Sequence, residues 1–125
     1  MNTYTLTLCA IAAIAAIFES NFDAKKNNPE HRISAVARVV IALCLSFLVF
    51  YGVLIPLLNA TAMLITFWIV FDPAYSYWKH GHFHHMGKTA VLDKIARRMG
   101  SDMYGWTALK CVFLAVTLTI LSYNI

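Results

Sequence analysis

Charged residues are scarce in this chain. They make up 13% of its 125 residues, whereas hydrophobic residues make up 60%. An ordinary soluble domain carries about twice that share of charge, and we therefore exclude that class. A charged side chain is costly at the centre of a bilayer, and Leu or Ile is favourable there. The composition is thus typical of a single integral membrane domain.

Common catalytic patterns are also lacking. The sequence shows no phosphate-binding glycine loop and no Ser-His-Asp, Cys-His or paired-carboxylate arrangement. The three cysteines, Cys9, Cys44 and Cys111, lie in apolar runs without CxxC spacing, which favours small buried hydrophobes over disulfides or metal ligands. Too little polar chain remains outside the apolar runs to enclose a substrate. We expect a protein that is not an enzyme.

Long apolar runs predict the fold. One run covers about 3–18 and another about 104–124, while residues 39–78 are broken by a single charge at Asp72. As one helix, residues 39–78 would measure about 60 Å, twice a bilayer core, so they must form two crossings. Pro56 and Asn59 mark the hairpin point, which gives spans near 37–57 and 60–78. We predict an all-α integral membrane protein with four transmembrane helices and polar connectors at 19–36 and 79–103.

The basic residues predict the orientation of these spans. All ten Lys and Arg and all five His lie within 25–38 and 79–110. Four spans place both segments on one side, which the positive-inside rule makes cytoplasmic. We therefore expect a multi-pass membrane protein with both termini outside and the charged connectors in the cytoplasm. Lys110 lies close enough to the start of the last span to extend its ammonium toward the membrane surface.

The connector 79–103 holds most of the polar chemistry. Residues 90–99 predict a short amphipathic interfacial helix before the last span, with apolar and basic residues on opposite faces. Such a helix favours the bilayer surface and anionic lipid headgroups over nucleic acid as its partner. The residues expected at this lipid interface are Lys88, Lys94, Arg97, Arg98, Trp78 and Trp106.

A histidine cluster begins this connector. Imidazole binds Zn and Ni, so the cluster is a candidate metal site. Its members are His80, His82, His84 and His85. Their spacing lacks the HExxH and HxxHH patterns of known metal enzymes, and within the cluster only His80 and His84 stand four residues apart. A solvated, interfacial His-rich turn is the favoured interpretation, and no resident cofactor is expected.

Asp72 and Pro73 form a second motif. Proline disfavours a helical conformation at the residue before it, and Asp followed by Pro is a good helix N-cap and first position. We therefore expect a kink or restart of the third span here, with Asp72 as a cap. The alternative is a functional intramembrane carboxylate paired with Arg38.

One stretch of the sequence resembles a known group of proteins. Matching positions follow a pattern of the form FD…G…GKTA…D and are Phe71, Asp72, Tyr75, Gly81, Phe83, Gly87, Lys88, Thr89, Ala90 and Asp93. The chain here is similar to small multi-span membrane proteins of Bacteroidetes bacteriophages and prophages, over about a quarter of its length. The resemblance implies a phage setting, and with it the inner membrane of a bacterial cell, and a structural motif built on Asp72, Gly87, Thr89 and Asp93, to which the sequence adds Pro73. It implies no particular activity.

Three functions remain open on these grounds. The first is a holin-like pore or small channel, formed by a homo-oligomer whose Ala-rich and Thr-bearing faces associate laterally. The second is a membrane-anchored interaction or recruitment module, for instance in phage exclusion, that uses the basic connector. The third is a membrane protein that binds metal through the histidine cluster.

Overall fold

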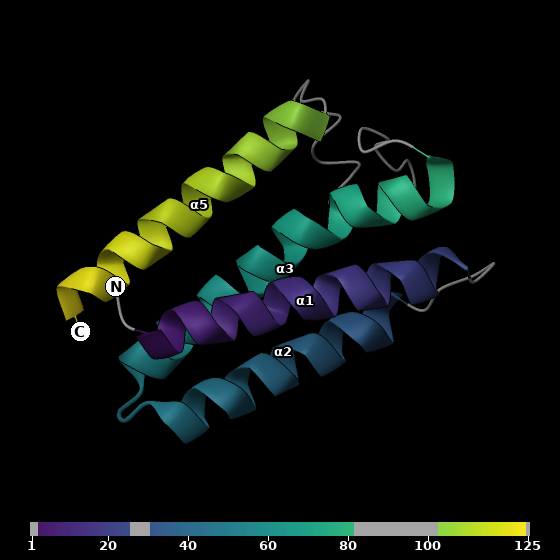
Figure 1. The fold of residues 1–125 in the computed structure, drawn as a ribbon. Coiled ribbons are helices and arrows are strands. Elements are labelled where there is room, and N and C mark those ends of the chain that lie inside the picture. Colours follow the sequence, from purple (N-terminus) through teal and green to yellow (C-terminus); the bar gives the residue numbers. More distant parts are fainter. Residues whose placement is uncertain (1–2, 26–30, 82–102, 125) are drawn as a thin grey trace.

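The structure is a computed structural model of the whole chain, and it describes residues 3–25, 31–81 and 103–124. Each of these segments is mainly α-helical (Figure 1). The helices are α1 (Thr3–Ala24), α2 (His31–Val49), α3 (Leu54–His80) and α5 (Met103–Asn124). The described part of the chain is therefore all-α, as the sequence predicts.

The helices run alternately back and forth along one bundle. Figure 1 shows that α1 and α3 point one way, while α2 and α5 return. Both chain termini lie at one end, together with the turn from α2 to α3. The C-terminal ends of α1 and α3 lie at the other end, as do the first residues of α2 and α5. The connection from α1 to α2 and the connection from α3 to α5, which carry most of the basic residues, thus both start and finish at the same end of the bundle.

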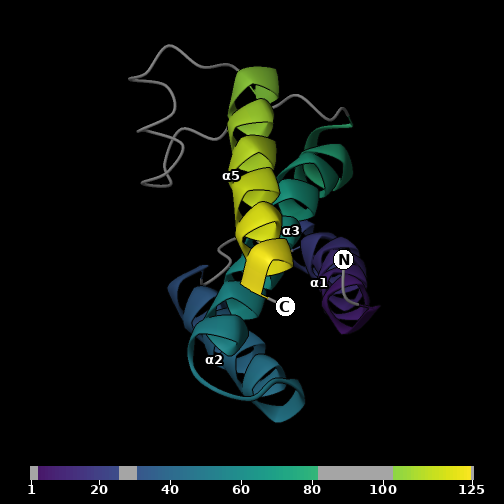
Figure 2. The same cartoon turned by 90° about the vertical axis from the view of Figure 1, so that its left-hand side faces the viewer.

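Helix α3 holds the bundle together because it packs against each of the other three helices. Its closest partner is α1, whereas α1 and α2 touch each other only slightly. Figure 2 shows α5 lying along α3, on the side away from α2. The buried core is built largely from small side chains, which let helix backbones approach closely. These are Ala12, Ala16, Ala42, Ala60 and Ala62, joined by the larger Met63, Phe67 and Phe71.

The outer surface of the bundle is apolar. Large hydrophobic side chains such as Ile14 and Phe18 on α1, Leu48 on α2 and Val116 on α5 are exposed. Three helical stretches are long and apolar enough to cross a bilayer, namely Thr3–Ala24, Leu54–His80 and Thr107–Asn124. Helix α2 has a shorter apolar stretch, Ala35–Val49. Exposed apolar surface of this extent suits a lipid environment.

The turn between α2 and α3 lies earlier in the chain than the hairpin point expected at Pro56 and Asn59. It occupies residues 50–53, and Gly52 has a φ of +81°, a left-handed conformation that glycine adopts at little cost. Pro56 instead lies in the first turn of α3, where a missing N–H breaks no helical hydrogen bond. The apolar sequence runs through both regions, so only the glycine marks the turn.

Helix α3 continues through Pro73, so of the kink and the restart that the sequence left open, the restart does not occur. The interpretation of Asp72 as a helix cap is therefore wrong, because Asp72 lies well inside α3. The helix ends at Gly81, whose φ is +80° and whose N–H donates to the carbonyl of Tyr77. Helix α1 continues beyond Glu19 to Ala24, farther than the expected end of its span. The amphipathic helix expected at 90–99 lies outside the described residues.

Candidate membrane-embedded charge sites

Arg38 of α2 forms an ion pair with Glu19 of α1. Its Nε and Nη2 donate to the same oxygen, Glu19 Oε1, at 3.1 and 2.7 Å. The Asp23 carboxylate, one helical turn farther along α1, lies 3.7 Å from Nη2. Two carboxylates of α1 therefore flank one guanidinium of α2. This contact joins two helices that otherwise touch each other only slightly.

The guanidinium of Arg38 also lies on aromatic rings of α3. Its central carbon is 4.4 Å from the ring centre of Phe67 and 4.8 Å from that of Phe71. Cations within about 6 Å of a ring are attracted to its face, by about 2 kcal/mol or more where water is excluded. Arg38 thus links α1, α2 and α3. The alternative pairing of Arg38 with Asp72 that the sequence left open is wrong.

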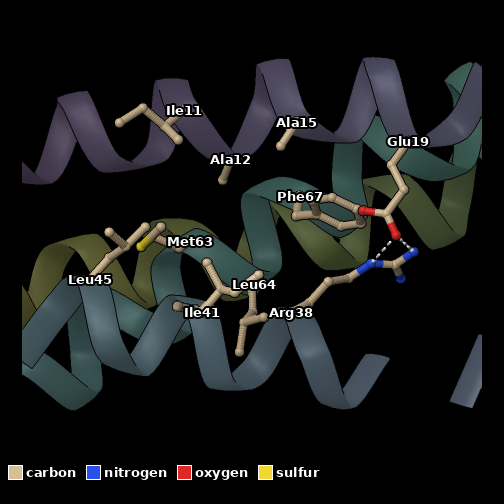
Figure 3. A pocket seen from close by; sticks show the side chains of 11 residues that line it. Ile11, Ala12, Ala15, Glu19, Arg38, Ile41, Leu45, Met63, Leu64 and Phe67 are labelled. Atoms are coloured by element: carbon tan, nitrogen blue, oxygen red, sulfur yellow. Dashed lines mark hydrogen bonds and ion pairs between the residues drawn. The ribbon is translucent and has the colours of Figure 1, made fainter. Parts of the chain in front are cut away.

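A groove of about 110 Å³ opens beside this ion pair (Figure 3). It lies between α1 and α2, and α3 forms its floor. The lining is apolar except at one end, where Glu19 and Arg38 face each other across it. Figure 3 shows small Ala12 and Ala15 on α1 opposite larger side chains on α2. The groove therefore has an apolar length and a charged end.

A second ion pair joins α3 and α5. The Lys110 ammonium donates to Asp72 Oδ2, and it lies 4.4 Å from the ring centre of Trp68. Only 1% of the Lys110 surface is exposed. The expectation that Lys110 extends toward the membrane surface is therefore wrong, because a carboxylate and an indole ring on the neighbouring helix satisfy its charge inside the bundle.

Other polar side chains of the described helices donate hydrogen bonds to groups within the bundle. Thr5 donates from its hydroxyl to the amide oxygen of Asn59 at 2.7 Å, and Asn59 donates to the carbonyl of Ile55. Most threonine hydroxyls instead donate to the carbonyl four residues earlier in their own helix, a common pattern for Ser and Thr in helices. These are Thr7, Thr61, Thr66, Thr117 and Thr119.

No family model, curated protein or solved structure matches this chain. The resemblance to phage and prophage membrane proteins therefore stays a prediction. Any proposal for the function of this chain therefore rests on its sequence and geometry.

Few of the sequence-predicted site residues can be placed. Trp78 and His80 are exposed at the C-terminal end of α3, where an interface residue is expected. Asp72 and Pro73 lie inside α3, and Asp72 pairs with Lys110. The other predicted metal, interface and motif residues lie outside the residues whose side chains are described. They are His82, His84, His85, Gly87, Lys88, Thr89, Asp93, Lys94, Arg97, Arg98 and Trp106.

Metal binding therefore stays a prediction. Within residues 3–25, 31–81 and 103–124, no three His, Cys, Asp or Glu side chains come together in a way that would hold a metal ion. Cys44 and Cys111 are exposed on the apolar surface and Cys9 is half-buried, each as a free thiol. The three cysteines come from three different helices.

Sequence reasoning missed both ion pairs as structural contacts. A signal for the first was present, because Glu19, Asp23 and Arg38 are the charges nearest to two apolar runs that meet at the same end of the bundle. For the second, Lys110 and Asp72 were the isolated charges of their own apolar runs. Isolated opposite charges in neighbouring spans are expected to pair.

Proposed function

We propose that this chain is a four-crossing membrane protein that acts as a membrane-anchored interaction module. The fourth crossing is α2. Because α1 and α3 run in the same direction (Figure 1), the chain between them returns across the same thickness. The apolar stretch Ala35–Val49 measures about 22 Å as a helix, short of a bilayer core of about 30 Å. Arg38 is the single charged residue within that stretch, and its ion pair with Glu19 lowers the cost of placing its charge in a bilayer.

The proposed orientation places residues 25–30 and 81–102 in the cytoplasm of a bacterial cell, with the chain termini and the turn at 50–53 outside. The basis is the positive-inside rule. Lys79, Lys88, Lys94, Arg97 and Arg98 then all lie on the inner side. The sequence assigns no Lys or Arg to the opposite side.

One observation favours the module: the described ion pairs join opposite charges on neighbouring helices. Arg38 pairs with Glu19 and Asp23, and Lys110 pairs with Asp72. The bundle therefore acts as a scaffold with paired charges, while the connector 79–103 keeps its excess of positive charge for a partner. An acidic protein surface or an anionic lipid surface has the complementary charge.

A photo-crosslinking experiment tests the module. A photoreactive residue at Met99 in the basic connector is expected to form protein adducts in cells, and one at Tyr51 in the opposite turn serves as the control. Replacing Lys94, Arg97 and Arg98 with Gln is expected to remove the Met99 adducts. Adducts that persist in this triple variant, or that form equally at Tyr51, contradict the proposal.

A holin-like pore is the second candidate, and the positions of three threonines favour it. Thr7, Thr61 and Thr119 are exposed on α1, α3 and α5, all in the half of the bundle that holds the chain termini. Several copies could place these threonines around a shared lumen. The pore predicts that the purified protein releases a small dye from vesicles. Dye retention at high protein-to-lipid ratio contradicts it.

A further inference from the structure

The groove beside Arg38 has the shape and polarity of a site for a lipid molecule. It runs along α1 from Glu19 back to Ile11, a distance of about 12 Å along the helix axis. Between these ends its lining is apolar. Apolar cavities of about 150 Å³ in proteins take up benzene, so a groove of about 110 Å³ accommodates several methylene groups of an acyl chain.

The charged end of the groove lies where a lipid headgroup would be. Glu19 is five residues before the end of α1 at Ala24, or about 7 Å along the axis. The interfacial region of a bilayer is about 5–7 Å thick on each side. From this end the groove extends toward the middle of the bundle, as an acyl chain extends from its headgroup.

The ion pair also leaves a donor and an acceptor for a ligand. Arg38 uses Nε and Nη2 toward Glu19, and its Nη1 donates to none of the described residues. Glu19 accepts both bonds on Oε1, and its Oε2 accepts from none of the described residues. The Glu19 side chain is one-third exposed and that of Arg38 one-fifth exposed, so both are within reach from outside.

The charge of the site selects among headgroups. Glu19 and Arg38 form a neutral pair, one carboxylate against one guanidinium. A purely anionic headgroup such as phosphoglycerol would add a negative charge beside Glu19 and bring no cation for its carboxylate. Phosphoethanolamine brings both signs, a phosphate that accepts from Arg38 Nη1 and an ammonium that donates to Glu19 Oε2. Phosphocholine has no N–H to donate.

From these observations we infer that the groove between α1 and α2 binds one phospholipid with an ethanolamine headgroup. Its acyl chain lies against Ala15, Ile41 and Leu45, and its headgroup lies on Glu19 and Arg38. This site is independent of the basic connector and of any partner that the connector binds. A lipid seated there also fills the space between two helices that contact each other only slightly.

Native mass spectrometry tests the inference. The full chain is purified in mild detergent and mixed with equal amounts of phosphatidylethanolamine, phosphatidylglycerol and phosphatidylcholine that share the same acyl chains. We expect one bound lipid per chain, with phosphatidylethanolamine preferred over each competitor by about fivefold or more. Retention of the three lipids in proportion to their supply indicates unselective surface lipid and overturns the inference.

Variants separate the two halves of the site. Ala15→Leu and Ile41→Phe each fill the groove from an exposed position, and each is expected to lose the bound lipid whatever its headgroup. Glu19→Gln keeps a polar side chain and is expected to bind the three lipids about equally. Ala10→Leu, on an exposed part of α1 outside the groove, is the matched control and retains wild-type binding. Wild-type binding by both groove-filling variants, or an unchanged preference in Glu19→Gln, contradicts the site.

Discussion

At the scale of single residues, five charged side chains decide how this bundle tolerates polarity inside an apolar environment. An isolated buried charge is costly, and a partner with hydrogen bonds offsets that cost. Arg38 and Lys110 each have a carboxylate and at least one aromatic ring, always from neighbouring helices. These contacts determine which helices are neighbours. An apolar surface alone does not specify that arrangement.

Removing one partner of the inner pair is expected to destabilise the bundle strongly. Lys110→Met leaves the Asp72 carboxylate without its cation and is expected to lower the free energy of unfolding by about 3 kcal/mol. The double variant Lys110→Met, Asp72→Leu removes both charges and recovers most of that loss. Reversible unfolding in mixed micelles measures both values. A double variant as unstable as the sum of the two single variants would show that the pair is not coupled.

At the scale of helices, small residues determine how closely α1 and α3 approach. Ala16 on α1 and Ala60 on α3 belong to the same buried core cluster, so a larger side chain at either position has to displace its neighbours. The periodic small residues of the first apolar run, including Ala12 and Ala16, were the sequence signal for this contact. What the sequence could not show is which helix would be the partner.

Enlarging the contact between α1 and α3 is expected to push these helices apart. Ala16→Leu should cost about 2 kcal/mol, because overpacking of a close contact forces side chains and backbone to shift. Ala10→Leu, exposed on the same helix, should change stability by less than about 0.5 kcal/mol. Thermal unfolding followed by circular dichroism gives both values. Equal melting temperatures for the two variants would contradict the observed packing.

Gly52 and Gly105 lie in segments of different backbone conformation, so replacing each with Ala should change stability in opposite directions. Gly52→Ala places a side chain at a φ of +81° with open space around it, so it should cost about 1 kcal/mol through the backbone alone. Gly105 lies in α5, where Ala favours the helical backbone more than Gly does. Gly105→Ala should therefore stabilise the protein by about 0.5 kcal/mol. Their melting temperatures should move in opposite directions. A shift in the same direction would place the turn elsewhere than at residues 50–53.

At the scale of the whole molecule, apolar length and the distribution of charge predicted the helical class and the long helices. They did not predict the turn at Gly52, because Pro56 and Asn59 carry stronger turn signals in isolation. They left open whether α3 kinks at Pro73 or ends and restarts there, and α3 continues through Pro73. Packing on both sides of α3, by α1 and α5, compensates for the hydrogen bond that Pro73 lacks. The candidate groove is lined by side chains from three successive helices, so no pattern within one helix could reveal it.

The central claim is that α2 crosses the membrane, so that the turn after it lies on the same side as the chain termini. Single cysteines at Lys25, Tyr51, Lys79 and Tyr123, in a background without Cys9, Cys44 and Cys111, test this by labelling intact cells with a membrane-impermeant maleimide. All four positions are exposed on the described structure or near its ends, and Tyr51 is 97% exposed. We predict labelling of Tyr51→Cys and Tyr123→Cys from outside, and of Lys25→Cys and Lys79→Cys only after permeabilisation. Labelling of Tyr51→Cys together with Lys25→Cys would contradict the fourth crossing.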